Sequence, residues 1–308
     1  MDLSIELLAS LSTPMIRTGL AAWVAQHLQD TDAARESLRG ELQTLLDQTD
    51  DGAITRMRET FAAAGDAWRF HPADPLSRAI TRVFMNRVVA ESEVFGAEHL
   101  EAFLAEPRQR RMVLCNHLSY TDTQVTDTVL VRAGFAEVAD RLVAVAGPKV
   151  YTDPWRRMAS IALNTRKTAQ SSAVASEQDT LTPRELAAVA FETMADCGRL
   201  MDEGYLVLLY PEGTRSRDGR LQPFLRAAAR YLLIEGVEVL PLAQVGGERM
   251  FPRDAPALTP GRATLTFGAP FRPRDYPGKT ATVDQAHTRI ASLLPERHTP
   301  PTGAPRVA

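Results

Sequence analysis

A short apolar run near the middle of the chain ends abruptly in a polar segment. Met112 to Cys115 are consecutive apolar residues, and the segment from Asn116 to Asp122 follows at once, with His117 as its second residue. The run has the length and composition of a buried strand. In an open α/β sheet, ligands bind beyond the carboxyl ends of the strands. The sequence therefore predicts a strand that ends where chemistry is usually performed.

The spacing of His117 and Asp122 admits two interpretations. Four residues separate them, enough for the chain to turn back and bring the carboxylate to the far ring nitrogen. That contact would fix the histidine tautomer and leave the other nitrogen free as a general base. Alternatively, the histidine is a structural residue at a strand end and Asp122 caps the next helix. The spacing alone does not decide between them.

Short apolar segments alternate with helical patterns beyond residue 94. A helix is expected at Pro183–Glu203, because Thr182 and Glu185 form a capping box, and Asn164–Ser176 has the composition of a polar loop. The expected strands are Met112–Cys115, Leu142–Ala146, Leu206–Tyr210, Val237–Ala243 and Ala263–Phe267. This alternation predicts an α/β fold with a mainly parallel sheet flanked by helices.

The two ends of the chain differ from its centre. Residues 1–93 are rich in alanine, leucine, arginine and glutamate and favour helices throughout, which predicts a helical N-terminal bundle. The α/β domain is expected at residues 94–295. Residues 296–308 contain several prolines and are expected to form a flexible tail.

Composition and charge exclude several classes of protein. A formal net charge of −3 argues against a general nucleic-acid binder. No apolar run approaches the roughly 18 to 20 residues that span a bilayer, and the N-terminus lacks the pattern of a secretory signal. A cytoplasmic location is therefore expected. Peripheral contact with the inner face of the membrane is compatible with it. No metal site is expected, because neither the histidines nor Cys115 and Cys197 have ligand spacing.

A second expected strand ends in an equally polar cluster. Leu206–Tyr210 run through Pro211 into the five residues Glu212–Ser216. Adjacent parallel strands would bring this cluster to the same rim of the sheet as His117. Its glycine suits a backbone that approaches a ligand closely, and Arg215 offers a two-pronged donor for a phosphate. A surface turn with an Arg–Glu ion pair is the ordinary alternative, but two such rims favour a site.

Together the two clusters resemble the glycerolipid acyltransferase superfamily, which includes glycerol-3-phosphate and lysophosphatidate acyltransferases. Its signature pairs N-H-x-S-x-x-D with E-G-T-R-S, and Asn116–Asp122 and Glu212–Ser216 match it residue for residue. The resemblance covers about residues 94–272. Residues 145–155 and 163–167 look like the acceptor segment of soluble plastid-type glycerol-3-phosphate acyltransferases, which nevertheless lack a full E-G-T-R-S box.

The resemblance implies transfer of a fatty acyl group from acyl-CoA or acyl carrier protein to a hydroxyl of lysophosphatidate or glycerol-3-phosphate, in phospholipid biosynthesis. His117 would act as general base, oriented by Asp122, and backbone N–H groups after His117 would stabilise the oxyanion. No cofactor is expected beyond the thioester co-substrate. The residues expected to bind the acceptor, with Arg215 foremost, are Glu212, Gly213, Thr214, Arg215, Ser216, Lys149, Arg166 and Lys167.

Two other functions fit the same residues. One keeps the chemistry but transfers the acyl group to a non-glycerol lipid or metabolite. The other is a noncatalytic module that binds lipid or an acyl carrier, and the pairing of His117 with Asp122 speaks against it, because such a module needs no positioned base.

Overall fold

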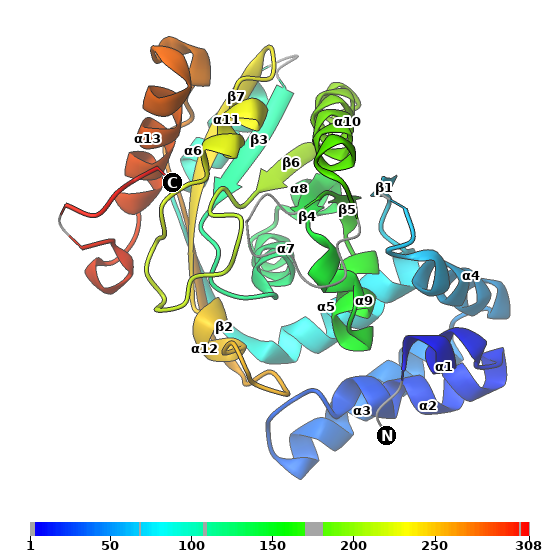
Figure 1. Cartoon of the computed structure of the whole chain (residues 1–308). Helices are drawn as coiled ribbons and strands as arrows, with labels where there is room; N and C mark the ends of the chain where they lie inside the picture. Colours follow the sequence, from blue (N-terminus) through cyan, green and yellow to red (C-terminus); the bar gives the residue numbers. More distant parts are fainter. Residues whose placement is uncertain (1–3, 68, 107–109, 170–180, 302, 308) are drawn as a thin grey trace.

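The computed structural model describes residues 4–67, 69–106, 110–169, 181–301 and 303–307. Its centre is an eight-stranded sheet in the order β1-β5-β4-β6-β3-β7-β8-β2 (Figure 1). The strands are β1 Phe70–His71, β2 Val89–Phe95, β3 Arg110–Cys115, β4 Leu142–Ala146, β5 Asn164–Lys167, β6 Leu206–Leu209, β7 Val237–Val245 and β8 Gly261–Phe267.

The five central strands are all parallel to one another, in the order β5, β4, β6, β3 and β7. At one edge β1 is antiparallel to β5. At the other, β8 is antiparallel to β7, and β2 is parallel to β8. The predicted mainly parallel sheet is therefore confirmed, and β3 lies at its centre between β6 and β7.

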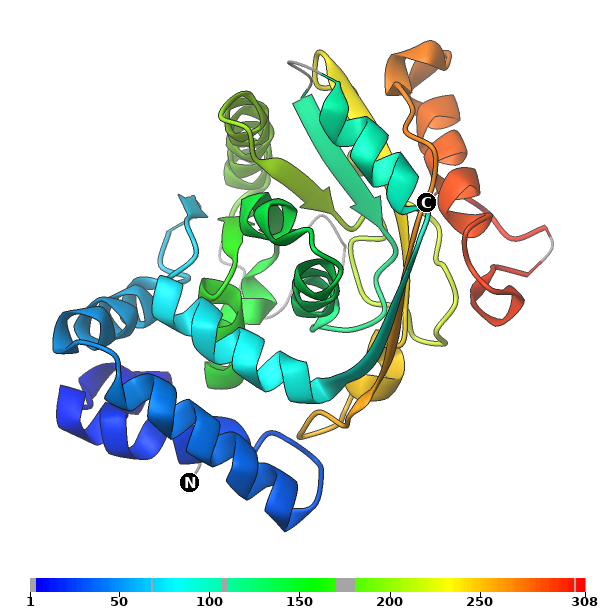
Figure 2. The ribbon, with the colours of Figure 1, turned by 180° about the vertical axis from the view of Figure 1, so that it is seen from behind.

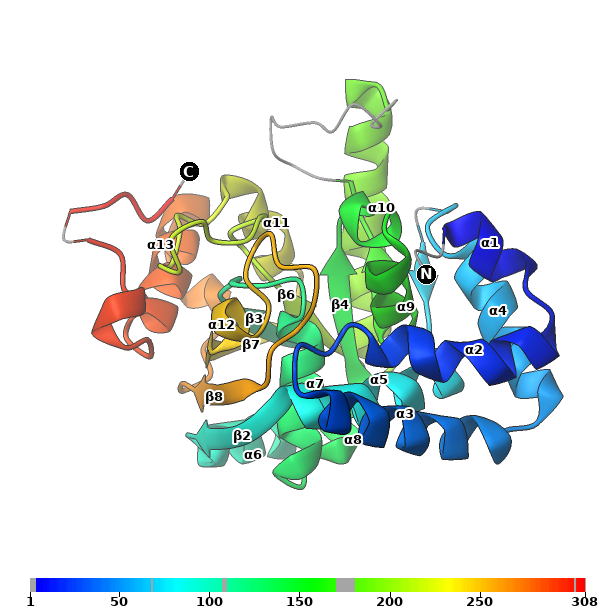
Figure 3. The same ribbon diagram turned by 90° about the horizontal axis from the view of Figure 1, so that it is seen from below.

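Helices cover both faces of this sheet (Figure 3). The helices α10 (Pro183–Asp202), α11 (Ala229–Leu232) and α13 (Gly278–Ala291) lie on one face, and α6 (Ala97–Ala105), α7 (Asp122–Arg132) and α8 (Ala136–Arg141) lie on the other (Figure 2). Alternate residues of β3 serve the two cores: Met112 and Leu114 pack in one, Val113 and Cys115 in the other. Burial on both sides explains why the strand is apolar from Met112 to Cys115.

The N-terminal helices pack beside the sheet domain rather than apart from it. They are α1 Ile5–Ser10, α2 Thr13–Ala25, α3 Asp32–Asp47, α4 Asp51–Ala63 and α5 Pro75–Val88. Two helices from later in the chain are α9 Pro154–Ile161 and α12 Gly247–Met250. Trp155 of α9 meets Trp23 at 6.0 Å and Phe84 at 4.8 Å between ring centroids. The apolar side chains of these helices join the core beneath the sheet.

The prediction of helix throughout residues 1–93 is wrong at its end. Both β1 and most of β2 fall inside that range, and β2 pairs with β8, so the expected boundary after residue 93 divides a strand. Strand β2 lies at the edge of the sheet, and Ala90 and Glu91 in it are exposed. An edge strand of this kind lacks the apolar run by which the sequence marks β3.

The predicted polar loop at Asn164–Ser176 is also wrong at its start. Residues 164–167 form β5 and are buried, and residues 170–176 lie outside the described part of the chain. The polar atoms of β5 find partners inside the protein, as when Asn164 Nδ2 donates to the carbonyls of Asp140 (2.8 Å) and Leu142 (3.0 Å). Polar composition hid a buried strand because each polar group is paired.

The expected flexible tail at residues 296–308 is held to the body of the protein at several described residues, although Pro301 and Pro305 are exposed. His298 is buried in a short 3₁₀ turn, Glu296–His298. Its carbonyl accepts the N–H of Leu221 (2.9 Å), and the carbonyl of Arg306 accepts the N–H of Phe224 (2.9 Å). The tail therefore braces the segment that follows the E-G-T-R-S cluster. Among the described helices, none is long and apolar enough to cross a membrane.

Candidate active site

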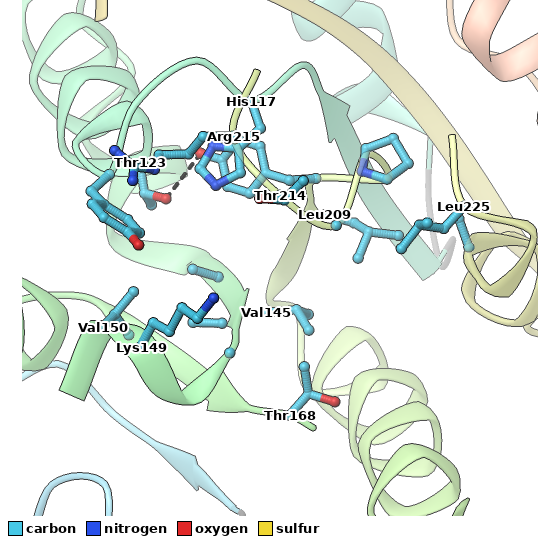
Figure 4. Close-up of a pocket in the computed structure, with 18 of the residues that line it drawn as sticks. His117, Thr123, Val145, Lys149, Val150, Thr168, Leu209, Thr214, Arg215 and Leu225 are labelled. Atoms are coloured by element: carbon cyan, nitrogen blue, oxygen red, sulfur yellow. Dashed lines mark hydrogen bonds between the residues drawn. The ribbon is translucent and has the colours of Figure 1, made fainter. Parts of the chain in front are cut away.

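The two polar clusters meet at the carboxyl ends of β3 and β6. These strands are parallel neighbours, as predicted, and the N–H of Ser216 donates to the carbonyl of His117 over 2.8 Å. A cavity of about 330 Å³ opens at this rim (Figure 4). It is bounded by the two clusters, by the segment after β4 and by Arg253, which follows α12.

His117 and Asp122 form the pair that the first interpretation of their spacing required. Asp122 Oδ2 lies 2.9 Å from His117 Nδ1. Helix α7 is capped by Thr121, and the side chain of Asp122 turns back toward the histidine. His117 lines the cavity, and its Nε2 has no hydrogen-bond partner among the described residues. The imidazole is held at one nitrogen and open at the other, which is the geometry of a general base.

The Asp122 carboxylate is buried, with 1% of its surface exposed, and fully hydrogen-bonded. Oδ2 also accepts the backbone N–H groups of Leu118 (2.7 Å) and Ser119 (2.9 Å), and Oδ1 accepts Nε2 of Gln244 (3.0 Å). A buried charge is tolerated when it is hydrogen-bonded in this way. The first two N–H groups after His117, which were expected to help form the oxyanion site, therefore donate to Asp122 instead.

Strand β7 supports this loop through Gln244, which belongs to neither sequence motif. Asn116 exchanges two hydrogen bonds with the backbone of Gln244, at 2.9 and 2.8 Å. A Cβ on Gly247 would lie 2.5 Å from Asp122 Oδ1, so the glycine is required for the close approach. Hydrogen bonds therefore connect Gln244 of β7 to Asp122, and Asp122 to His117.

Glu212 anchors the two loops to each other. It is 3% exposed, and its two oxygens accept the N–H of His117 (2.6 Å) and the N–H of Gln222 (2.9 Å). Burial raises the pKa of Glu212 to about 8, against the opposing effect of these two hydrogen bonds. Glu212 was expected to bind the acceptor, but it does not line the cavity and instead joins the two loops.

The remaining residues of the E-G-T-R-S cluster divide between cavity and loop. Gly213, Thr214 and Arg215 line the cavity. Gly213 has a φ of +69°, and a Cβ there would lie 2.2 Å from Leu225. Ser216 is buried and does not line the cavity, since its hydroxyl donates to the carbonyl of Arg220 (2.7 Å). Ser216, which was expected to bind the substrate, therefore holds the loop and is not brought to the cavity.

Four cationic side chains line the cavity: Lys149, Arg215, Arg217 and Arg253. No aspartate or glutamate is among the described lining residues, and the structure shows no ion pair for any of the four within its described ranges. Arg215 lies over the ring of Tyr120, 3.5 Å from its centroid. Lys149 extends from the wall opposite His117 and Arg215 (Figure 4). This end of the cavity suits an anion.

Arg166 and Lys167, predicted as phosphate ligands, do not line the cavity. Arg166 is 1% exposed, and its Nε lies 2.6 Å from Asp196 Oδ2. The ammonium of Lys167 donates to the carbonyl of Gly65. Both cations contact partners inside the protein along β5, so the structure does not bring these two expected ligands to the cavity. Arg253, by contrast, was not predicted, because it stands alone in a loop far from both motifs.

The opposite part of the cavity is apolar. Figure 4 shows Val145, Leu209 and Leu225 on the side away from Arg215. Other apolar lining residues are Ala144, Ala146, Ala169, Pro211, Ala227 and Ala228, while Val150 lies beside Lys149. The cavity thus has a cationic part and an apolar part, and His117 lines it from the loop after β3.

Two side chains near His117 are not placed as nucleophiles. Cys115 is fully buried in β3, and burial raises the pKa of its thiol. The hydroxyl of Ser119 donates to the carbonyl of Phe251 over 3.1 Å. Within the described part of the chain, neither has a hydrogen bond to a base that would activate it.

Comparison with known proteins agrees with this site. The sequence profile of the family described as Acyltransferase matches residues 91–245, about half of the 308 residues. The chain belongs to this acyltransferase family. The match contains both motifs, and the resemblance seen in the sequence is confirmed.

Relatives of this acyltransferase include 1-acyl-sn-glycerol-3-phosphate acyltransferases from algae and plants. The protein of Chlamydomonas reinhardtii is 32% identical over 103 residues, which cover 33% of this chain and 30% of the relative. The chloroplastic protein BAT2 of Brassica napus is 41% identical over 100 residues, which cover 32% of this chain and 28% of the relative. The matched part therefore spans less than a third of either relative.

Among solved structures, the 1-acyl-sn-glycerophosphate acyltransferase PlsC from Thermotoga maritima aligns with 94% of each chain. The sequence identity is 16% and the TM-score is 0.46.

Proposed function

We propose that this acyltransferase moves a fatty acyl group from a thioester to the free hydroxyl of lysophosphatidate. The observation that carries the proposal is the His117–Asp122 pair, whose open nitrogen lies on a cavity that is cationic at one end and apolar at the other. The acceptor unites a phosphate and an acyl chain in one molecule. The names of the curated relatives favour lysophosphatidate over glycerol-3-phosphate.

In the proposed reaction, His117 Nε2 takes the proton of the acceptor hydroxyl while its oxygen attacks the thioester carbonyl carbon. The bond between Asp122 and Nδ1 holds the tautomer and stabilises the imidazolium that forms. Collapse of the tetrahedral intermediate breaks the carbon–sulfur bond, and the imidazolium returns the proton to the leaving thiolate. A thioester is already activated, so a positioned base and alignment of two substrates suffice.

Arg215 is the proposed first ligand of the acceptor phosphate, with Lys149, Arg217 and Arg253 around it. A guanidinium matches two phosphate oxygens at once. The apolar wall is the proposed place of an acyl chain. The donor, acyl-CoA or acyl carrier protein, would approach the open rim. Peripheral contact with the cytoplasmic face of a membrane belongs to the same proposal, since the acceptor is a lipid.

Release of free thiol from a long-chain acyl-CoA tests this function. The assay compares lysophosphatidate, glycerol-3-phosphate and no acceptor, and repeats each with acyl carrier protein as donor. Release that depends on lysophosphatidate supports the proposal, and release that depends on glycerol-3-phosphate moves the protein to the first acylation step. Acceptor-independent release would indicate a thioesterase. Tight binding without release from either donor would indicate a noncatalytic module.

A further inference from the structure

The proposed reaction creates an oxyanion for which the expected donors are not free. The thioester carbonyl oxygen gains negative charge as the tetrahedral intermediate forms. The N–H groups of Leu118 and Ser119 are held by Asp122, and the N–H of His117 is held by Glu212. A preorganised donor at such an oxygen is often the largest single contribution to catalysis. With these three N–H groups engaged, other donors beside His117 are the candidates for this role.

Tyr210 lies directly against the histidine. It follows β6, and its ring stacks on the imidazole of His117 with centroids 4.5 Å apart and an interplanar angle of 27°. Its hydroxyl lies 2.9 Å from Oγ1 of Thr123, in the first turn of α7. Both hydroxyl-bearing residues line the cavity together with His117. Figure 4 shows Thr123 close to the His117 ring.

The hydroxyl groups of Tyr210 and Thr123 carry two O–H hydrogens, and their mutual hydrogen bond uses only one of them. Tyrosine and threonine each carry one O–H hydrogen. Their mutual hydrogen bond uses one of the two, whichever residue donates it. Neither hydroxyl has another hydrogen-bond partner among the described residues. One O–H therefore has no acceptor in the described protein, at a position on the cavity wall beside the base.

We propose that Tyr210, oriented by the hydroxyl of Thr123, donates this hydrogen bond to the thioester oxyanion. Thr123 is then a positioning residue that donates to the phenol oxygen and leaves the phenol O–H directed at the substrate. The step adds no bond and consumes no reactant: the phenol keeps its proton while His117 carries the proton of the acceptor to the leaving thiolate. This inference rests on the proposed acyl transfer.

The surroundings of Tyr210 keep it in the form that donates. Burial raises the pKa of its phenol well above the ordinary value, and the nearby Asp122 carboxylate acts in the same direction. A neutral phenol is thereby maintained around neutral pH. The cations on the wall, Arg215 and Lys149, are available to the phosphate rather than to the carbonyl oxygen.

Tyr210→Phe tests the assignment because it keeps the ring on His117 and removes only the hydroxyl. We expect kcat to fall by about 10²- to 10³-fold, the usual cost of an oxyanion donor, with the KM values for donor and acceptor nearly unchanged. Thr123→Val should lower kcat less. The double variant should lose little more than Tyr210→Phe alone, because both act through one hydrogen bond.

The matched control is Tyr205→Phe, which removes a phenol hydroxyl just before the other end of β6 and outside the cavity. It should retain the activity of the parent. Thermal unfolding of each variant separates loss of catalysis from loss of fold, and Thr123→Val provides the same test if Tyr210→Phe fails to fold.

The outcomes separate this inference from the proposed function. A parent protein that transfers acyl groups, together with a folded Tyr210→Phe variant within about threefold of its kcat, overturns the oxyanion role and leaves the function standing. A loss that appears in KM alone also overturns it, since a transition-state contact acts on kcat. A parent protein that releases no thiol contradicts the proposed function and, with it, this inference.

Discussion

The loop around His117 and the cationic wall of the cavity use their polar groups in opposite ways. Asp122 makes four hydrogen bonds within the protein, and Glu212 accepts from two backbone groups. The four cations that line the cavity have no ion-pair partner in the described part of the chain; they are Lys149, Arg215, Arg217 and Arg253. Polar groups that position His117 are already hydrogen-bonded within the protein, whereas groups that bind a substrate must have no partner in the protein. Changes in the first region should therefore affect turnover, and changes in the second should affect affinity.

The largest effect should follow His117→Ala. General-base catalysis contributes roughly 10²- to 10⁴-fold, so turnover should fall by about that factor. The fold should persist, because the imidazole makes its hydrogen bond only through Nδ1. Steady-state kinetics and denaturant unfolding check the two statements. Near-normal turnover would remove His117 from the mechanism.

Asp122→Asn should damage both catalysis and stability, which sharpens the contrast between the regions. An amide has one acceptor oxygen where the carboxylate has two, and its NH₂ would face donors already aimed at the site. We expect a loss of about 1 to 3 kcal/mol in the free energy of unfolding and a fall in turnover. Unfolding and kinetics on the same preparation measure both. Unchanged stability would contradict the network described for this carboxylate.

Arg215→Ala should act mainly on the acceptor. A hydrogen bond to a charged group is worth about 1.5 to 3 kcal/mol, so the KM for lysophosphatidate should rise by roughly 10- to 100-fold while the fold is kept. Arg230→Ala, an exposed arginine on α11 outside the cavity, is the control. A change confined to the KM of the thioester donor would place the phosphate elsewhere.

The last prediction concerns the change in stability per pH unit that Glu212 confers. With its pKa near 8 in the folded protein and near 4.5 when unfolded, the native state keeps a proton that the unfolded state releases. Stability should therefore fall as pH rises from about 4.5 to 8, by at most about 1.4 kcal/mol per pH unit. Denaturant midpoints for the parent and Glu212→Gln across this range measure it. A parent profile no steeper than that of the variant would be inconsistent with a raised pKa.

The sequence was most informative where hydrophobicity and motif coincide. Strand β3 is apolar on both sides and leads straight into the loop of His117, so strand, base and partner were predictable together. Strand β5 reversed these signals, because its polar residues are buried and paired within the protein. Arg166 and Lys167 resembled binding residues for that reason. Composition reports which groups a chain carries, but it does not report which of them the fold consumes.

Arg253 and Gln244 show the second limit of prediction. Neither belongs to a motif, and both reach the site only because β7 lies beside β3 and the segment after α12 closes over the cavity. Contacts of this kind depend on the order of strands in the sheet. That order is set by packing across the whole domain rather than by local sequence.

The packing of the chain end has a practical consequence. The carbonyl of Arg306 holds the N–H of Phe224, and the next residue, Leu225, is part of the apolar wall. Residues that stand far from either motif therefore support the wall at which we propose that an acyl chain binds. A tag or a truncation at that end would be expected to change which chain lengths the protein accepts before it changed the chemistry at His117.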